Sequence, residues 1–144
     1  MAGDHVAVIG PGPLGLISAQ VAKVFGAERV YLIGTRASRL SVGAETGADR
    51  VINVHDEDPV SVVLEETGGI GADLVIESSG AMDAPMMAIK MAKPMGRILL
   101  LGIPHEPVLV DLKDLLMKNK SIHTVRGEGW ANVARASLCW DPAR

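Results

Sequence analysis

Short apolar runs alternate with longer amphipathic segments along this 144-residue chain. Six of the runs predict β-strands, at Val6–Ile9, Arg29–Ile33, Arg50–Ile52, Leu74–Glu77, Arg97–Leu101 and Ser121–Val125. The segments between and after them predict helices at Pro13–Phe25, Ser38–Thr46, Pro59–Thr67, Asp83–Ala92, Leu112–Asn119 and Trp130–Trp140. Most of the strands are too uniformly apolar to have one face in water, which favours a parallel sheet covered on both sides.

Start and stop signals lie at the ends of several predicted helices. Pro13 and Pro59 suit first-turn positions, Asp83 suits an N-cap, and Gly26 and Gly47 lie where helices should end. Strand, helix and strand repeated in this way give right-handed crossovers. The sequence therefore predicts an α/β, doubly wound six-stranded parallel sheet, the Rossmann fold, with strand order 3-2-1-4-5-6.

Composition narrows the class of protein. The length fits a single domain, and 48% hydrophobic with only 3% aromatic residues indicates an aliphatic core. The net charge of −3 provides no basic patch for nucleic acid or for a membrane surface, and no apolar run is long enough to cross a bilayer. Cys139 is the only cysteine, which excludes an intrachain disulfide and predicts a cytoplasmic location.

The most informative segment is Gly10–Gly15, which reads GPGPLG between the first predicted strand and the first predicted helix. Gly10 allows a tight turn, Gly12 removes the side chain where a pyrophosphate must approach the backbone, and Gly15 lets the helix pack closely on the strand. The N-terminus of the following helix then offers N–H groups to the negatively charged pyrophosphate. In this context the pattern predicts a dinucleotide-binding loop.

The end of the second predicted strand suggests which dinucleotide is bound. Residues 30–40 contain no Asp or Glu, although an acid usually binds the adenosine ribose hydroxyls here. Gly34 makes room for a 2′-phosphate, Thr35 can donate a hydrogen bond, and Arg36 or Arg39 can supply a guanidinium. This pattern favours NADP over NAD. The alternative is that both arginines only solvate the start of a surface helix.

Small residues follow the fourth and fifth predicted strands, in Glu77–Gly80 and Gly102–His105. Ligands of open parallel sheets bind at the carboxyl ends of the strands, near the point where the strand order reverses. Small residues at these positions therefore leave room for the nicotinamide half of a cofactor. Each segment taken alone also fits an ordinary turn.

No residue stands out as catalytic. His5, His55, His105 and His123 lack the clustered spacing of metal ligands, so we expect no metal site from this chain alone. His105 follows a cofactor-side strand end, but a lone loop histidine is more often solvent-exposed. Arg126 could contact cofactor or pair with a surface carboxylate. A serine triad and a nucleophile elbow are absent, so the sequence predicts a binding site without catalytic groups.

Four segments together resemble the cofactor-binding domain of the zinc-type alcohol dehydrogenases, the medium-chain dehydrogenase/reductase family, especially its threonine- and sorbitol-dehydrogenase-like branch. They are Gly3–Gly15, Ala44–Asp49, Thr67–Glu77 and Pro94–Arg97, and with them the resemblance covers nearly the whole chain. It implies reversible hydride transfer between a nicotinamide dinucleotide and an alcohol or carbonyl, usually with a catalytic zinc as Lewis acid.

The resemblance also implies three groups of cofactor contacts. They are Gly10, Gly12, Pro13, Leu14 and Gly15 for the pyrophosphate, Thr35 and Arg36 for the adenosine end, and Ser79, Gly102 and Ile103 for the nicotinamide side. Many NAD-using members carry Asp where this chain has Gly34, and some members with the Gly-Thr-Arg pattern use NADP. The family's zinc ligands, proton relay and substrate pocket lie in a separate catalytic domain. We expect residues 1–144 to be a single NAD(P)-binding domain without that catalytic domain.

Members of the family often dimerise by pairing their sixth strands. Here that strand would include Ile122–Val125, and because an uncovered strand edge is sticky we predict a homodimer through it. A related hypothesis is that Trp130, Leu138 or Trp140 covers a face that the missing domain normally buries.

Two other classes of protein use the same fold. One is a non-catalytic nucleotide-sensing or interaction module. The other is an S-adenosylmethionine-dependent methyltransferase, whose loop usually pairs with an acid at the second strand end, which this chain lacks. The sequence therefore favours an excised or truncated dehydrogenase domain that binds cofactor but cannot turn over alone.

Overall fold

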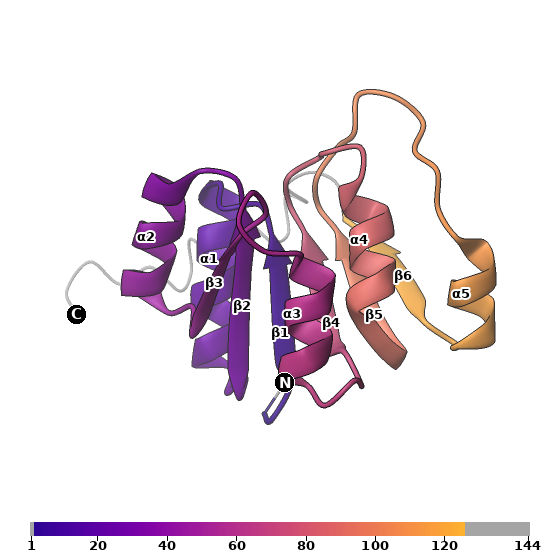
Figure 1. Cartoon of the computed structure of the whole chain (residues 1–144), viewed down its shortest axis with the longest axis horizontal. Helices are drawn as coiled ribbons and strands as arrows, with labels where there is room; N and C mark the ends of the chain where they lie inside the picture. The colour runs from indigo at the N-terminus through magenta and orange to yellow at the C-terminus, as the bar shows by residue number, and fades with distance from the viewer. Residues whose placement is uncertain (1, 126–144) are drawn as a thin grey trace, which may run out of the picture.

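The computed structural model describes residues 2–125, which form a single sheet with helices on both faces (Figure 1). The strands are β1 (His5–Ile9), β2 (Arg29–Gly34), β3 (Arg50–Asn53), β4 (Ala72–Glu77), β5 (Ala92–Leu100) and β6 (Ser121–Thr124). The helices are α1 (Pro13–Val24), α2 (Ala37–Thr46), α3 (Pro59–Glu66), α4 (Ala84–Met91) and α5 (Leu112–Met117). All strand pairs are parallel, in the order β3-β2-β1-β4-β5-β6. The predicted Rossmann fold is confirmed.

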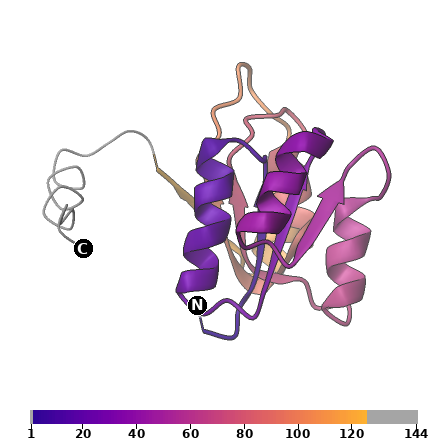
Figure 2. The ribbon, with the colours of Figure 1, turned by 90° about the vertical axis from the view of Figure 1, so that its left-hand side faces the viewer.

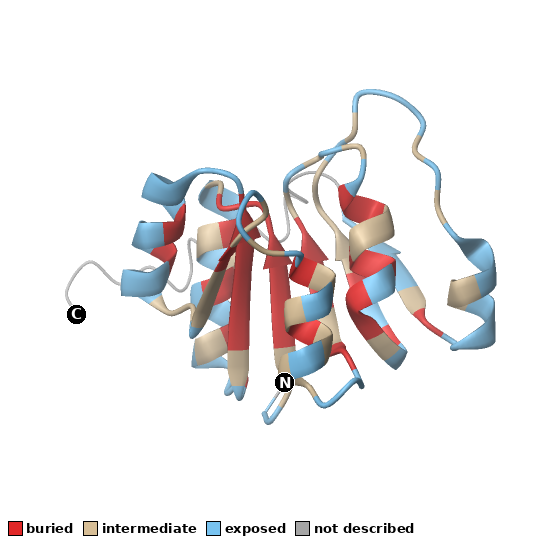
Figure 3. Ribbon diagram, viewed as in Figure 1, coloured by how far each residue is buried: buried red, intermediate tan, exposed pale blue. Residues whose placement is uncertain are grey.

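Two apolar clusters hold the helices on the sheet. Side chains alternate between the faces of a strand, so β1 to β5 each place side chains in or against both clusters, whereas β6 contributes to neither. Leu32 and Leu40 lie in the cluster under α1 and α2, whereas Ile33, Val63 and Ile89 lie in the cluster under α3 and α4. Figure 2 shows α1 and α2 on one side of the sheet and α3 on the other. The central strands are the most deeply buried part of the chain (Figure 3).

The fifth and sixth strands differ most from the prediction. β5 begins at Ala92, directly after α4, and not at Arg97. It pairs first with Ala72, and a register shift then brings Arg97 opposite Leu74. Met95, in this irregular stretch, has a positive φ of 60°, which is uncommon for a residue other than glycine. β6 is exposed at the sheet edge, so burial on both faces does not extend to it.

The helix starts follow the predicted chemistry with one difference. Pro13 and Pro59 occupy the first turns of α1 and α3. Asp83 is the N-cap residue of α4, but its side chain makes no capping hydrogen bond. Asp58, the N-cap residue of α3, does make a capping hydrogen bond: it accepts from the Ser61 N–H at 3.1 Å. The hydrogen bonds from Ser61 hold the pKa of the Asp58 carboxyl below its ordinary value.

A buried lysine ties the end of the sheet to two helices. The side chain of Lys120 is fully buried just before β6. Its Nζ donates to the Ile89 carbonyl of α4 at 2.5 Å and to Asp114 Oδ2 of α5 at 2.7 Å. Hydrogen bonds from Lys118 and then Lys120 lower the pKa of the Asp114 carboxyl. α4, α5 and β6 are therefore joined by a charged contact shielded from water.

No helix among residues 2–125 is long and apolar enough to cross a membrane. Arg126 and the predicted helix Trp130–Trp140 lie outside the described residues.

Candidate functional site

Two of the three loop glycines are required by the fold itself. Gly10 has a φ of +102°, and a β carbon there would lie 2.8 Å from the backbone nitrogen of Ser79. A β carbon on Gly15 would collide with the carbonyl oxygen of Gly10. The loop after β1 therefore packs backbone against backbone, both on α1 and on the loop after β4. This confirms the close helix packing predicted for Gly15.

Gly12 has no such structural reason to be glycine. It is the N-cap of α1, with φ −81° and ψ −179°, which is extended backbone that any residue adopts. A β carbon added there would have no heavy atom within 4 Å. The space in front of Gly12 is open, and a side chain would extend into it. A ligand that must reach the backbone at this point explains the residue better than the fold does.

The first turn of α1 faces this opening with a favourable charge for an anion. The first N–H groups of a helix have no partner within the helix, and the helix dipole makes this end positive. Pro13 takes the first position, where its missing N–H costs nothing, and no acidic residue lies in the first turn. The N–H groups of Leu14 and Gly15 are thus the natural anion donors.

A pocket joins this loop to the end of β2. Its lining residues are Gly10, Pro11, Gly12, Thr35, Arg36, Arg39, Ser78 and Ser79. Thr35, Arg36 and Arg39 are all exposed to solvent. The lining contains two guanidinium groups and no carboxylate, which suits a ligand with several negative charges. The structure thus brings the glycine loop and the predicted adenosine-side residues into one pocket.

The role of Gly34 needs correction. The sequence suggests that this glycine makes room for a phosphate, but Gly34 is buried at the end of β2. A β carbon there would collide with Cδ and Cγ of the Pro11 ring. The space is therefore occupied by the glycine loop itself. An acid at position 34 would require Pro11 to move or to be replaced.

Glu77 organises the loop after β4 and was not identified from the sequence as a site residue. It is only 1% exposed. Its Oε1 accepts hydrogen bonds from the Ser79 N–H at 2.7 Å, the Ser79 hydroxyl at 2.6 Å and the Gly80 N–H at 3.0 Å. Ser78 donates from its hydroxyl to the Ile9 carbonyl at 2.9 Å. The available signal was an acid at the end of a buried strand, because a buried carboxylate must find donors.

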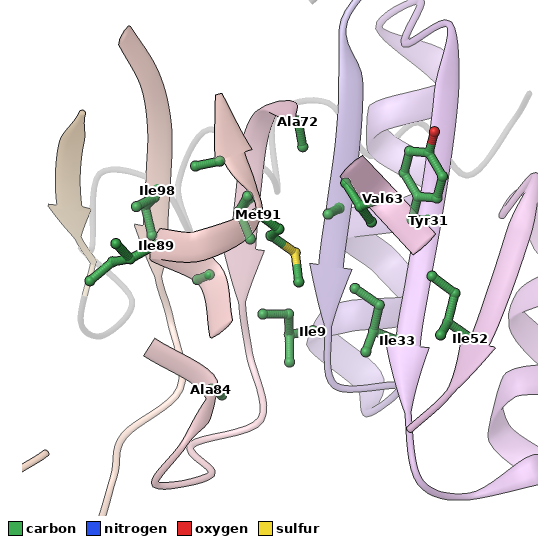
Figure 4. Packing of buried hydrophobic residues seen from close by; sticks show 14 residues of the cluster. Ile9, Tyr31, Ile33, Ile52, Val63, Ala72, Ala84, Ile89, Met91 and Ile98 are labelled. Atoms are coloured by element: carbon green, nitrogen blue, oxygen red, sulfur yellow. The ribbon is translucent and has the colours of Figure 1, made fainter. Parts of the chain in front are cut away.

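An apolar pocket lies beside the charged one. Ile9, Ile33, Val54 and Met87 form much of its wall, and Thr35 and Ser79 line both pockets. Ile9 and Ile33 are seen at this end of the core in Figure 4. A pocket with apolar walls and a few polar groups at its edge suits the flat face of an aromatic ring system.

Gly102 and Ile103 line a third pocket, next to β6, which Ser79 does not line. A β carbon on Gly102 would collide with the backbone nitrogen of Gly80, and one on Gly80 would lie 2.8 Å from the Ile103 carbonyl oxygen. The loops after β4 and β5 are therefore in backbone contact. All three pockets follow carboxyl ends of parallel strands, where ligands of this fold bind.

Residues 2–125 contain no group of three or more His, Cys, Asp or Glu side chains that could hold a metal ion. His105, in the loop after β5, is exposed. The described part of the chain therefore does not fit a catalytic zinc, which needs three protein ligands and an open position.

The sheet order, the glycine loop at the start of α1 and the pockets at the carboxyl edge define a dinucleotide-binding α/β domain. The family model described as zinc-binding dehydrogenase matches residues 13–138. The chain belongs to this zinc-binding dehydrogenase family, and not to the methyltransferases considered above. This confirms the resemblance seen in the sequence.

Curated relatives include L-threonine 3-dehydrogenases. That of Bacillus licheniformis is 39% identical over 138 residues, covering 92% of this chain and 40% of the relative. That of Symbiobacterium thermophilum is 40% identical over 123 residues, covering 85% of this chain and 35% of the relative. The chain thus spans well under half the length of the relatives that it matches.

Solved structures of similar fold include an alcohol dehydrogenase of Thermotoga maritima, with a TM-score of 0.88, 26% identity, and coverage of 95% of this chain and 39% of the other. An alcohol dehydrogenase of Thermus sp. ATN1 has a TM-score of 0.85 and 34% identity, with the same coverage of 95% and 39%. A putative zinc-binding dehydrogenase of Sinorhizobium meliloti, solved bound to NADP, has a TM-score of 0.87 and 26% identity, covering 95% and 41%.

The different roles of the loop glycines can be separated by two matched substitutions. Gly12→Ala is expected to change the free energy of unfolding by less than about 1 kcal/mol, because its backbone is ordinary and its surroundings are open. It should weaken dinucleotide binding, because the added methyl group enters the ligand space. Gly15→Ala is expected to destabilise the fold by about 2 kcal/mol or more, because its methyl group meets backbone.

Thermal unfolding and fluorescence titration with NADPH check both variants. A Gly12→Ala protein that binds as tightly as the parent would contradict the assignment of the open space to a ligand.

Proposed function

We propose that this chain is the cofactor-binding domain of an NAD(P)-dependent dehydrogenase that transfers hydride between a nicotinamide dinucleotide and an alcohol or carbonyl. The observation that carries the proposal is the open space at Gly12, which lies at the N-terminus of α1 in a pocket with Arg36 and Arg39. Family membership supports the reaction class, because the matched relatives include threonine and alcohol dehydrogenases.

Each part of the cofactor has a corresponding part of the site. The pyrophosphate binds at the glycine loop, with N–H groups of Leu14 and Gly15 as donors. The adenine ring enters the apolar pocket, and Ser79 lies with the adenosine half because it lines the same two pockets as Thr35. The pocket with Gly102 and Ile103 takes the nicotinamide half.

The residues of this chain bind and orient the dinucleotide. Hydride transfer to or from the substrate needs catalytic groups in addition. Zinc supplies a Lewis acid that polarises the alcohol or carbonyl oxygen in enzymes that use it. Because the described residues offer no ligand set for zinc, we place the zinc site, the proton relay and the substrate pocket in a catalytic domain outside residues 1–144. Residues 1–144 then act as one NAD(P)-binding domain. A single cysteine suits a cytoplasmic location.

NADP is the favoured cofactor. A 2′-phosphate adds negative charge beside the adenosine ribose, and the pocket there has Arg36 and Arg39 without a carboxylate. The packing of Pro11 on Gly34 further disfavours an acid that would hold the ribose of NAD. The Sinorhizobium structure of similar fold, solved bound to NADP, supports this choice.

The partner at the sheet edge is a second copy of the chain. β6 ends the sheet and leaves its outer edge uncovered by the described residues. Ile122 and Val125 are 38% and 53% exposed, and Leu116 and Met117 of α5, the helix that precedes β6, are 76% and 75% exposed. An uncovered edge flanked by apolar side chains favours pairing of two sixth strands into a continuous sheet.

Replacing Arg36 tests the cofactor assignment. Arg36→Ala is expected to weaken NADPH binding about tenfold or more and to leave NADH binding nearly unchanged, because a hydrogen bond to a charged group contributes about 1.5–3 kcal/mol. Fluorescence titration with each cofactor measures the two constants. Arg97→Ala is the matched control, because Arg97 lies on β5 and pairs with Asp4, away from the pocket. An equal loss of affinity for both cofactors, or no loss for either, would reject the proposed contact between Arg36 and the 2′-phosphate.

The contact between Pro11 and Gly34 gives a second test. Gly34→Asp alone is expected to lower the melting temperature, because its β carbon collides with the Pro11 ring. The double variant Pro11→Ala with Gly34→Asp should recover stability and shift the preference toward NADH, because the new carboxylate accepts from the ribose hydroxyls and repels the phosphate. Pro11→Ala alone is the control. Unchanged stability of Gly34→Asp would show that the packing argument is wrong.

The dimer is tested by a charge on the edge strand. Ile122→Lys is expected to convert the dimer to a monomer at micromolar concentration, because a lysine ammonium would be buried against the second copy. Light scattering measures the mass. Ile70→Lys, at a 61% exposed position in the loop after α3, should leave the dimer intact. A monomeric parent chain would contradict this mode of assembly.

A further inference from the structure

Asp83 is the one charged residue among those that line the apolar pocket. The rest of the lining is apolar or glycine, apart from the hydroxyl groups of Thr35 and Ser79. Asp83 is exposed to solvent, so water satisfies its carboxylate when no ligand lies beside it. A ligand that enters the pocket must either leave this water in place or supply a hydrogen-bond donor for the carboxylate.

The Asp83 carboxylate has no role in holding the fold together. Asp83 is the N-cap residue of α4, and its main-chain carbonyl accepts a helical hydrogen bond from the Met87 N–H at 3.0 Å. Its φ of −92° and ψ of −15° are helical, whereas a capping residue is normally extended, and its side chain makes no capping hydrogen bond. Within residues 2–125 the carboxylate has no hydrogen bond or ion pair of any kind. An acceptor is therefore free beside the pocket.

The place of Asp83 in the pocket indicates which part of a bound nucleotide would reach it. Thr35 and Ser79 line both the charged and the apolar pocket, so the ribose that joins the phosphates to the base belongs next to them. Asp83 and Met87 line only the apolar pocket and are four residues apart, on one side of the start of α4. Asp83 would thus meet the edge of the base that lies farthest from the ribose.

We infer that Asp83 selects adenine over purines with an oxo group at position 6, by accepting a hydrogen bond from the N6 amino group. The inference rests on the proposed function and on its placement of adenine in the apolar pocket. Adenine carries a donor at this position, whereas hypoxanthine and guanine carry a carbonyl oxygen, which is an acceptor. An ionised carboxylate can only accept, so it pairs with the amino group and repels the carbonyl.

The other side chains of the lining cannot make this distinction. Apolar walls select a flat ring, but they discriminate weakly between rings that differ in one polar group. The hydroxyl groups of Thr35 and Ser79 can both donate and accept. The Ser79 hydroxyl already donates to Glu77 Oε1 at 2.6 Å. The choice between the two kinds of purine therefore depends on Asp83.

Two cofactors that differ only at position 6 of the purine test the inference. They are NADPH and its hypoxanthine counterpart, in which an oxo group replaces the amino group. In fluorescence titration the 144-residue protein is expected to bind NADPH about tenfold more tightly, because the hypoxanthine form leaves the carboxylate without a donor. Asp83→Asn, whose carboxamide can donate as well as accept, should reduce the ratio to about twofold or less. Asp83→Lys, whose ammonium can only donate, should reverse the preference.

Glu45→Gln is the matched control. It removes the same negative charge from an exposed position in the last turn of α2, and Glu45 lines neither pocket. Each protein is judged by the ratio of its two dissociation constants, so a general effect of net charge on anion binding cancels. Far-UV circular dichroism establishes that each variant is folded, and Asp83→Ala repeats the test should another variant unfold.

The outcomes separate the inference from the proposed function on which it rests. Equal binding of the two cofactors by the parent chain would overturn the inference and leave the proposed function standing. A preference for adenine that persists in folded Asp83→Asn and Asp83→Lys would also overturn the inference. Binding of neither cofactor would overturn the proposed function, and the inference with it.

Discussion

The structure depends on the contact between two backbone turns, one after β1 and the other after β4. Gly10 lies against Ser79 with no room for a side chain, and Gly15 brings α1 equally close to Gly10. Ser78 adds a hydrogen bond to the Ile9 carbonyl, so the two turns are also joined by a side chain. This contact fixes where α1 begins, and with it the position of the open space at Gly12. Without it the N-terminus of α1 would have no defined relation to the pockets.

Much of the fold and part of the site could be predicted from sequence because both depend on local patterns. Strand runs, helix periodicity and the order of elements follow from the spacing of apolar residues, and the GPGPLG segment indicates its own turn and helix. What could not be predicted depends on contacts between distant residues. The collision between Pro11 and a side chain at Gly34 is one such contact. The early start of β5 at Ala92 depends on pairing with Ala72.

In the candidate site, too, some features follow from local sequence patterns and others are seen only in the structure. The spacing of the loop predicts ligand space at Gly12 and a turn and close packing at Gly10 and Gly15, and the structure adds which atoms a side chain at each position would meet. Glu77 was missed because its role depends on donors that come from its own loop, after the strand has ended. A residue can thus shape the site through the backbone that it holds, and its only mark in the sequence is a single acid at the end of a buried strand.

The buried contact of Lys120 gives α4 a double role. Ile89, in the last turns of α4, accepts the hydrogen bond from the Lys120 ammonium, while Ala84 and Met87 of the same helix line the apolar pocket. Leaving a buried ammonium without its partners would be costly, so β6 and α4 must move together. The outer edge of the sheet and the wall of the pocket thus form one mechanical unit. A displacement of the edge strand would reach the pocket through α4 as well as through the pairing of β6 with β5.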